Sequence, residues 1–217
     1  MAKIHPATPG ASDDAVRGLL DRYSCPVPFH AVRTRFLGNI ASPSMAASPM
    51  EMVKGLWGSE LPAFDSLEEA NVLLGALVMG LWNRLTRHQD RSHPFRLVRP
   101  DLPVGREGLG RIARIRREEL EGFVEGLFGT DQELGLPERA HRALQVLAEM
   151  RAMFAAVEDL TGDALKPASA DDISGTARHV RELTRVAEHE MHEVVLSCTR
   201  ARRQALRSLP AVKPVLH

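Results

Sequence analysis

The chain has 217 residues and a mass of 23.9 kDa, and its 28 Lys and Arg residues balance 28 Asp and Glu residues, so its formal net charge is zero. Apolar residues make up 44% of the sequence, which excludes a mainly disordered chain. Balanced charge argues against a general nucleic-acid binder, because such proteins draw most of their affinity from phosphate neutralisation. With only 5% aromatic residues, the core must be built from Leu, Val, Ala, Met and Ile.

The two cysteines, Cys25 and Cys198, are far apart in the sequence and no CxxC motif occurs. This excludes a disulfide framework and a thiolate zinc site. Residues 1–10 lack the apolar stretch of a signal peptide, and the uncharged run over residues 70–82 is shorter than the roughly 20 residues that span a bilayer. We therefore expect a cytoplasmic protein with no membrane partner.

Helix signals dominate the first half of the chain. Ser12 is typical of an N-cap and predicts a helix over residues 13–23, which Pro26 and Pro28 end. A second helix is expected over residues 29–40.

Two Ser-x-x-Glu sequences predict capping boxes, in which serine and glutamate side chains bind backbone amides at a helix start. Ser48 to Glu51 predicts a short helix that ends at Trp57, and Ser66 to Glu69 predicts a long helix to about Gln89. Leucines at four-residue spacing give the long helix one apolar face. Further apolar residues extend this face round most of the helix, which indicates a position in the middle of a domain. The face is Leu73, Leu77, Leu81 and Leu85, and the extension is Val72, Leu74, Val78 and Trp82.

The second half reads as three further helices separated by linkers. Three prolines make residues 93–104 a crossover loop rather than a helix. Helices are expected over residues 107–128 and 137–160, and a last helix runs from about 171 or 176 to 208. Each has an apolar stripe at helical spacing.

The sequence therefore predicts an all-α protein of about seven helices in an irregular bundle with a long C-terminal helix. We divide it into a helical domain over residues 1–160 and a linker with the long helix over residues 161–217, which packs on that domain or on a partner subunit. Small residues are expected to allow close helix packing at Gly75, Gly80, Gly122 and Gly126. Loop or cap geometry explains Gly108 and Gly110.

Charge is segregated along the chain. Residues 84–117 contain ten Arg against three acids, residues 118–133 contain six acids and no base, and residues 196–217 contain five bases and no acid. Solvated faces and internal ion pairs are the ordinary interpretation. The alternative is that the arginine stretch, or the tail with Arg200, Arg202, Arg203 and Arg207, docks an acidic partner.

Residues 188–193 form the densest cluster of possible metal ligands. A zinc-protease helix needs two histidines four apart, whereas His189 and His192 are three apart. Glu188 with His192, or His189 with Glu193, has the spacing to share a metal. Both histidines lie off the apolar stripe, so we expect them to face solvent or a partner.

His88 and His93 flank the end of the long helix beside arginines, where an anion could bind, but nothing fixes that geometry and a solvated helix end is the favoured interpretation. No GxSxG, P-loop or strand-borne GxGxxG motif occurs. We therefore assign no catalytic, cofactor or metal-binding residues.

Several short motifs resemble the YecA/YgfB-like family of bacterial proteins. They are the Trp-Gly turn at Trp57, the Pro-x-Phe at Phe64, the acidic helix start at Glu68 and the ending at Asn83, with Phe36 and Phe123 as further elements. The resemblance covers about residues 30–160 and implies an all-helical, non-enzymatic bacterial protein. Some members of that family carry a C-terminal Cys/His zinc motif, which has no counterpart here, so the resemblance implies no metal.

The function favoured by these observations is a non-enzymatic protein-binding or regulatory module with a protein partner, for which an acidic protein is one candidate. One alternative is a metal-dependent enzyme that uses His189, His192 and Glu193. The other is a nucleic-acid-associated regulator that uses residues 84–117, although a nucleic-acid partner is disfavoured by the balanced charge.

The long C-terminal helix also predicts a homodimer. Its stripe keeps a seven-residue spacing, as in helices packed along their length, and an unbroken helix would overhang its own domain. The stripe is Val180, Leu183, Ala187, Met191, Val194, Cys198 and Ala201. The competing prediction is that this helix packs across its own domain. Separately, we expect Trp57 and Trp82 to be substantially buried and structural.

Overall fold

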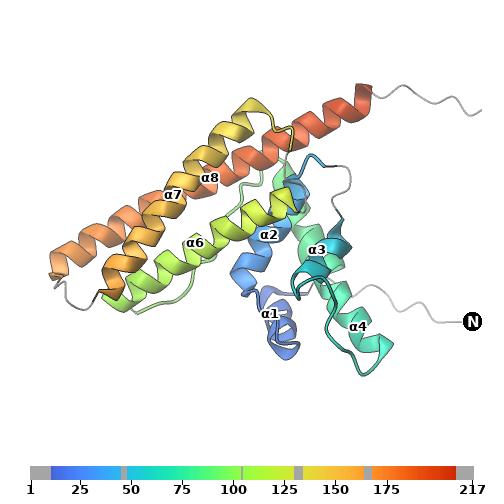
Figure 1. The fold of residues 1–217 in the computed structure, drawn as a ribbon, viewed down its shortest axis with the longest axis horizontal. Coiled ribbons are helices and arrows are strands. Elements are labelled where there is room, and N and C mark those ends of the chain that lie inside the picture. Colours follow the sequence, from blue (N-terminus) through green and yellow to red (C-terminus); the bar gives the residue numbers. More distant parts are fainter. Residues whose placement is uncertain (1–10, 45–47, 104, 130–133, 164–167, 209–217) are drawn as a thin grey trace, which may run out of the picture.

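A computed structural model of the chain describes residues 11–44, 48–103, 105–129, 134–163 and 168–208. These residues form seven helical segments and no strand, which confirms the predicted all-α class. The segments, in chain order, are α1 (Asp13–Arg22), α2 (Phe29–Ala41), α3 (Pro49–Gly55), a continuous run of α4 (Leu67–Leu74), η1 (Gly75–Trp82), α5 (Asn83–Leu85) and η2 (Thr86–Gln89), then α6 (Arg106–Phe128), α7 (Glu138–Gly162) and α8 (Ala170–Ser208). Figure 1 shows α6, α7 and α8 side by side on one half of the molecule and α1, α3 and α4 on the other, with α2 between them.

Two of the three predicted serine caps form. The hydroxyl of Ser12 accepts a hydrogen bond from the amide of Ala15, and that of Ser66 accepts one from the amide of Glu69, each at 3.2 Å. The Ser48 side chain makes no cap hydrogen bond, so the capping box predicted there is wrong. Pro49 at the first turn, which has no amide hydrogen to satisfy, begins α3 instead.

The run from α4 to η2 buries its predicted face but not its other sides. Leu73, Leu77, Leu81 and Leu85 are all buried. Val72 and Met79 are exposed, so the expectation that this helix is surrounded by protein is wrong. The run forms an outer layer, and a π-helical stretch (η1) interrupts its regular turns.

The closest helix contact in the described residues involves glycines of α2 and α6. A Cβ atom placed on Gly122 would lie 2.7 Å from the carbonyl oxygen of Ala31, and one on Gly126 or Gly38 would collide with the backbone of the opposite helix. The packing role predicted for Gly122 and Gly126 is confirmed. Gly75 meets nothing within 4 Å, so the same prediction is wrong there.

Gly110 differs from expectation, because it is a position of packing between helices rather than a loop or cap position, whereas Gly108 contacts the loop that leads into α6. A Cβ on Gly108 would collide with the carbonyl of Pro103, and one on Gly110 would collide with the Thr161 side chain. The start of α6 is therefore held tightly against the end of α7.

Helix α8 is unbroken over 39 residues, which corresponds to about 58 Å. Its predicted stripe is buried from Val180 to Cys198 within the same chain, where α8 packs against α7, α2, α6 and η2. The stripe is therefore not available as a dimer interface, and the competing prediction that α8 packs across its own domain describes this helix. The predicted homodimer would therefore need another surface, and it stays a prediction.

Residues 90–103 form an extended strap without helical structure, as the prolines predict. Phe95 and Leu97 of the strap are buried, and Phe95 meets His88 edge-to-face with ring centroids 5.2 Å apart. The strap therefore belongs to the core although it has no regular structure.

The two tryptophans are half-buried rather than buried. The indole N–H of Trp57 donates to the carbonyl oxygen of Tyr23 at 2.9 Å, and that of Trp82 donates to the Asn39 side chain at 3.2 Å. Both rings pack on the core, and their hydrogen bonds join the turn after α3 to the end of α1 and the run from α4 to η2 to α2. No helix in the described part of the chain is long and apolar enough to cross a membrane.

Candidate functional site

A cluster of buried charged groups fixes the strap to α6 and α8. On α6, Arg116 donates to the carboxylate of Glu119, to the hydroxyl of Thr184 and to the carbonyl of Val98. Glu119 also accepts the amide of Val98 at 2.9 Å, and it is fully buried. One arginine and one carboxylate therefore satisfy both backbone groups of Val98.

Helix α8 binds the strap in the same way. The carboxylate of Glu188 accepts the amide of Leu97 at 3.0 Å and a guanidinium N–H of Arg96 at 2.8 Å. His192, one turn further, is hydrogen-bonded through Nε2 to the carbonyl oxygen of His88 at 3.1 Å. The Nδ1 atom of His88 lies 2.8 Å from the carbonyl oxygen of His93.

Burial shifts two of these groups in opposite directions. It raises the pKa of Glu119 to about 7, against the opposing effects of Arg116 and the Val98 amide. Burial lowers the pKa of His88 to about 4. Because the pKa of Glu119 is raised, its ionisation costs stability as pH rises from 4.5 toward 7. Because the pKa of His88 is lowered, its protonation costs stability as pH falls from 6.5 toward 4.

These buried groups bind backbone atoms of the strap, and none of Glu119, Glu188 and His192 lines any of the three cavities described below. Their hydrogen bonds stabilise the position of a segment that has no helix or sheet bonds of its own. We assign the cluster a structural role.

The structure separates the residues of the His/Glu cluster predicted on α8. His192 and Glu188 are buried, so the expectation that His192 faces solvent or a partner subunit is wrong. The physical reason is that the strap and η2 of the same chain cover that side of α8. The other candidate ligand pair is His189 with Glu193. The His189 side chain is 66% exposed, and Glu193 pairs with Arg139 at 3.4 Å, so these two side chains do not face a shared metal position.

Among the described residues, no group of three His, Cys, Asp or Glu side chains is placed to hold a metal ion. His88 likewise differs from the predicted solvated helix end, because it is buried, whereas His93 is exposed. The metal-enzyme alternative stays a prediction, without a three-ligand set in the described part of the chain.

The arginine stretch over residues 84–117 largely meets internal partners. Salt bridges join Arg114 and Arg117 of α6 to Glu158 of α7, at 2.6 and 3.1 Å. Arg106 donates to carbonyl oxygens at the end of α7, and Arg84 pairs with Asp13. The internal ion pairing considered from the sequence is therefore present.

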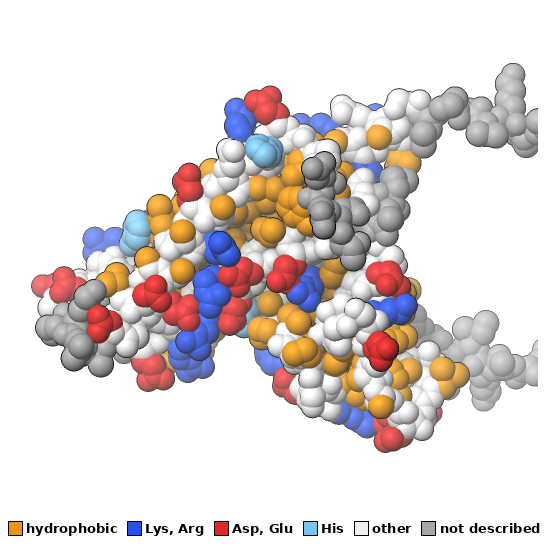
Figure 2. All heavy atoms as spheres, viewed as in Figure 1, with side chains coloured by type: hydrophobic (Ala, Val, Ile, Leu, Met, Phe, Trp, Pro, Cys, Tyr) orange, Lys and Arg blue, Asp and Glu red, His pale blue; other side chains and the backbone are white. Residues whose placement is uncertain are grey.

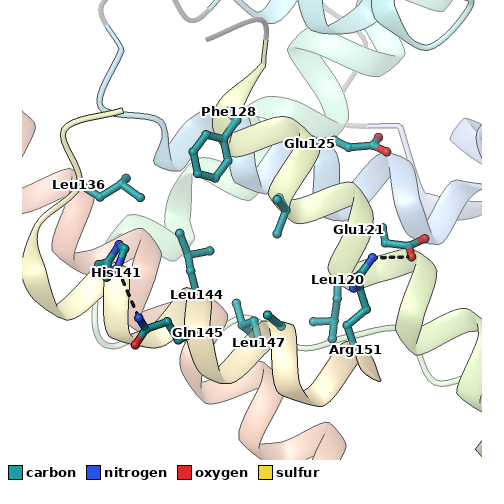
Figure 3. A pocket seen from close by; sticks show the side chains of 12 residues that line it. Leu120, Glu121, Glu125, Phe128, Leu136, His141, Leu144, Gln145, Leu147 and Arg151 are labelled. Carbon is teal, nitrogen blue, oxygen red and sulfur yellow. Dashed lines mark hydrogen bonds and ion pairs between the residues drawn. The ribbon is translucent and has the colours of Figure 1, made fainter. Parts of the chain in front are cut away.

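An apolar groove opens between α6 and α7, with a volume of about 660 Å³. The two helices are held together at the start of α6 and diverge toward its end, and Figure 2 shows apolar side chains gathered in the hollow between them. Leu120 and Leu147 lie buried at its base. Figure 3 shows Phe128, Leu136 and Leu144 around the wider end.

The walls of the groove carry unequal charge. Glu121 and Glu125 lie along the α6 edge, and His141, Gln145 and Arg151 lie along the α7 edge (Figure 3). Arg151 lies 3.5 Å from Glu121. With two glutamates and one arginine, the lining has a formal charge of −1 if His141 is neutral. The α6 edge is therefore acidic.

The apolar stripes predicted for these two helices include Leu120, Leu144 and Leu147, but the stripes alone did not predict the groove. The groove residues that those stripes did not include are Val124 and Phe128, which follow Leu120 at four-residue spacing. That spacing gives α6 a second apolar stripe beside the one that contacts α2, and a second stripe is the signal that could have revealed the groove.

A second cavity, of about 640 Å³, lies among α1, α2 and the strap. Two of its charged residues have partners in the same chain: His30 is 2.6 Å from Glu118, and Arg33 lies 3.9 Å from Asp13 and over the ring of Phe95. A third cavity, of about 490 Å³, lies against the C-terminal part of α8 and is lined mostly by polar side chains.

Comparison of the chain with protein-family models, with curated proteins and with solved structures finds no match. The resemblance to the YecA/YgfB-like family therefore stays a prediction, and the functional argument depends on the surfaces themselves.

Proposed function

We propose that the chain is a non-enzymatic protein-binding module that takes an amphipathic helix of a partner protein into the groove between α6 and α7. The observation that carries the proposal is the pair of diverging helices with an open apolar interior. Grooves of this kind bind helices through apolar side chains repeated at three- and four-residue spacing.

The acidic edge defines the chemistry of the partner. Glu125 has a side chain that is 55% exposed, and it reaches toward Arg35 of α2, while Glu121 is shared between Arg117 and Arg151. A bound helix with Lys or Arg beside its apolar face would add favourable charge contacts along this edge, whereas a helix flanked by Glu would be repelled.

Two synthetic helical peptides of about 18 residues test this proposal. Both carry the same leucine stripe, and the polar face is built from Lys in one and from Glu in the other. We expect the Lys peptide to bind at least about tenfold more tightly by fluorescence anisotropy. Equal affinities would contradict the proposed charge preference.

The control uses two valines of matched exposure. Val124 in the groove is 38% exposed and Val186 on α8, outside the groove, is 41% exposed. Val124→Lys is expected to weaken the Lys peptide at least about tenfold, and Val186→Lys by less than about twofold. If both variants bind like the unmodified chain, the groove is not the binding site.

A second copy of this chain is the competing occupant. Sedimentation equilibrium on the same proteins separates the two cases, because a dimer that Val124→Lys dissociates and Val186→Lys does not would show that the groove is a self-association surface. The acidic protein partner expected from the arginine-rich segments does not suit this acidic edge and would need a different surface.

A further inference from the structure

The polar cavity on α8 lies where this helix leaves the body of the protein. Figure 1 shows the C-terminal end of α8 extending past the other helices. The cavity is formed between this part of α8 and the loop after η2, with a volume of about 490 Å³. Such a volume lies within the range of about 300–1,000 Å³ that is typical of small-molecule sites.

Four arginines line this cavity, and they come from two elements. Arg200, Arg203 and Arg207 lie on one face of α8 at spacings of three and four, and Arg91 belongs to the loop after η2. In the described part of the chain, no ion pair within 4.0 Å is recorded for any of them. Their positive charge is therefore available to a ligand.

The one acidic residue in the lining is already engaged. Asp90 accepts hydrogen bonds from the amide and the hydroxyl of Ser92, at 2.8 and 2.7 Å. These bonds lower the pKa of Asp90 below its ordinary value. Four arginines and one aspartate leave the cavity with a formal charge of +3.

A buried hydroxyl also belongs to this lining. Thr199 is 3% exposed, and its Oγ1 is the one buried side-chain N or O atom in the described residues that has no hydrogen-bond partner. Buried polar atoms without a partner are rare in folded proteins, because each costs about 1–3 kcal/mol. Thr199 is the residue before Arg200 and lines the same cavity, so a ligand there could accept its hydrogen bond.

From these observations we infer that the cavity is a binding site for a small molecule that carries two or three linked phosphate groups. Guanidinium groups bind phosphate oxygens through paired N–H donors, and the Thr199 hydroxyl adds a neutral donor. The α8 arginines extend over about 10 Å of helix, which suits linked phosphates better than a single ion.

A formal charge of +3 also favours a polyphosphate over a carboxylate. One carboxylate brings a single charge and two oxygens, whereas each phosphate group brings more oxygens and up to two charges. The four arginines converge on one cavity that a buried hydroxyl also lines, which favours a compact ligand over a nucleic-acid strand, because a strand binds along extended basic grooves. The inference does not depend on the groove between α6 and α7.

Isothermal titration calorimetry of the full chain with tripolyphosphate, pyrophosphate and orthophosphate tests the site at low ionic strength. We expect affinity to increase in the order orthophosphate, pyrophosphate, tripolyphosphate. Arg200→Gln with Arg203→Gln should weaken tripolyphosphate by at least about 100-fold, and Thr199→Val by about two- to tenfold.

The matched control removes two charges from the same helix outside the cavity, through Arg178→Gln with Arg181→Gln. Both residues are exposed. This variant should bind tripolyphosphate within about twofold of the unmodified chain. An equal loss in both double variants would show non-specific attraction to a basic helix and would overturn the inference.

Two further ligands complete the test. A poly-Glu peptide or a single-stranded oligonucleotide that binds this site more tightly than tripolyphosphate would overturn the inference in favour of an acidic protein or a nucleic acid. Absence of tripolyphosphate binding at millimolar concentration would overturn it as well. Circular dichroism of each variant checks that the fold is retained.

Discussion

The two arginine-rich segments of this chain look alike in the sequence and differ in the fold. Residues 84–117 contain ten arginines, and six of them bind carboxylates or carbonyl oxygens of the same chain. In the last turns of α8, Arg202 donates to the carbonyl of Ser42, whereas Arg200, Arg203 and Arg207 surround a cavity and have no ion-pair partner recorded among the described residues.

The difference follows from what lies opposite each segment. Residues 84–117 face the acidic parts of α6, α7 and α8, so internal ion pairs form. The end of α8 extends beyond the other helices and faces a loop with one engaged aspartate. A run of arginines therefore indicates a ligand site only where the fold leaves it without carboxylates.

The largest expected effect comes from the buried pair in the first segment. Glu119→Ala leaves Arg116 buried without its carboxylate, and we expect a loss of about 3–5 kcal/mol in the free energy of unfolding, measured in urea. Glu125→Ala on the same helix removes an exposed carboxylate and should cost less than about 1 kcal/mol.

If Glu119→Ala does not fold, the double variant Glu119→Leu with Arg116→Met provides the test. Replacing both charges by apolar groups should recover most of the lost stability, because the penalty arises from the unpaired charge. A loss below about 1 kcal/mol for Glu119→Ala would show that the first segment is no more dependent on internal pairing than the end of α8.

A smaller effect is expected from His88, which lies in the first segment and is held uncharged by burial. Its pKa is lowered to about 4, so the stability it contributes is present above pH 6.5 and is lost as pH falls toward 4. The loss is at most about 1.4 kcal/mol per pH unit. The difference in unfolding free energy between the unmodified chain and His88→Leu should therefore narrow over this range.

The neighbouring exposed residue supplies the control for this titration. His93→Leu keeps the His93 carbonyl that His88 contacts, so this variant should retain the acid-dependent loss. A constant difference between His88→Leu and the unmodified chain from pH 6.5 to 4 would contradict the assignment.

The smallest expected effect concerns the second segment. Arg200, Arg203 and Arg207, replaced together by Gln, should change the free energy of unfolding by no more than about 0.5 kcal/mol without ligand, since no internal pair is lost. Thermal melts in the presence of tripolyphosphate should show stabilisation of the unmodified chain but not of this triple variant. A loss above about 1 kcal/mol without ligand would show that these arginines do stabilise the fold, and the contrast between the segments would fail.

Local signals predicted the helices well, because caps and breakers act within a few residues. Ser12, Ser66 and the prolines before α2 and α7 mark helix starts within one or two residues. The fold class and the long α8 helix followed from the apolar periodicity.

The surroundings of the polar residues could not be predicted in the same way. His192 lies off the apolar stripe of α8, which indicated solvent, but residues about 100 positions earlier cover it. The groove was missed for the opposite reason, since Leu144 has a core-like spacing and yet α6 and α7 diverge beside it. Periodicity gives the direction of a side chain on its helix and does not give what the rest of the chain places there.

The strap has a consequence for the order in which the molecule is completed. The amide of Leu97 depends on Glu188, which the ribosome adds 91 residues later, on the order of 5–20 s at ordinary rates of synthesis. Until then, the strap lacks the carboxylate that binds the Leu97 amide, and the faces of α7 and α6 that pack against α8 are uncovered. The nascent chain would therefore pass through an interval in which chaperones and proteases have access to this surface, and a polypeptide that stopped after α7 would remain in that state.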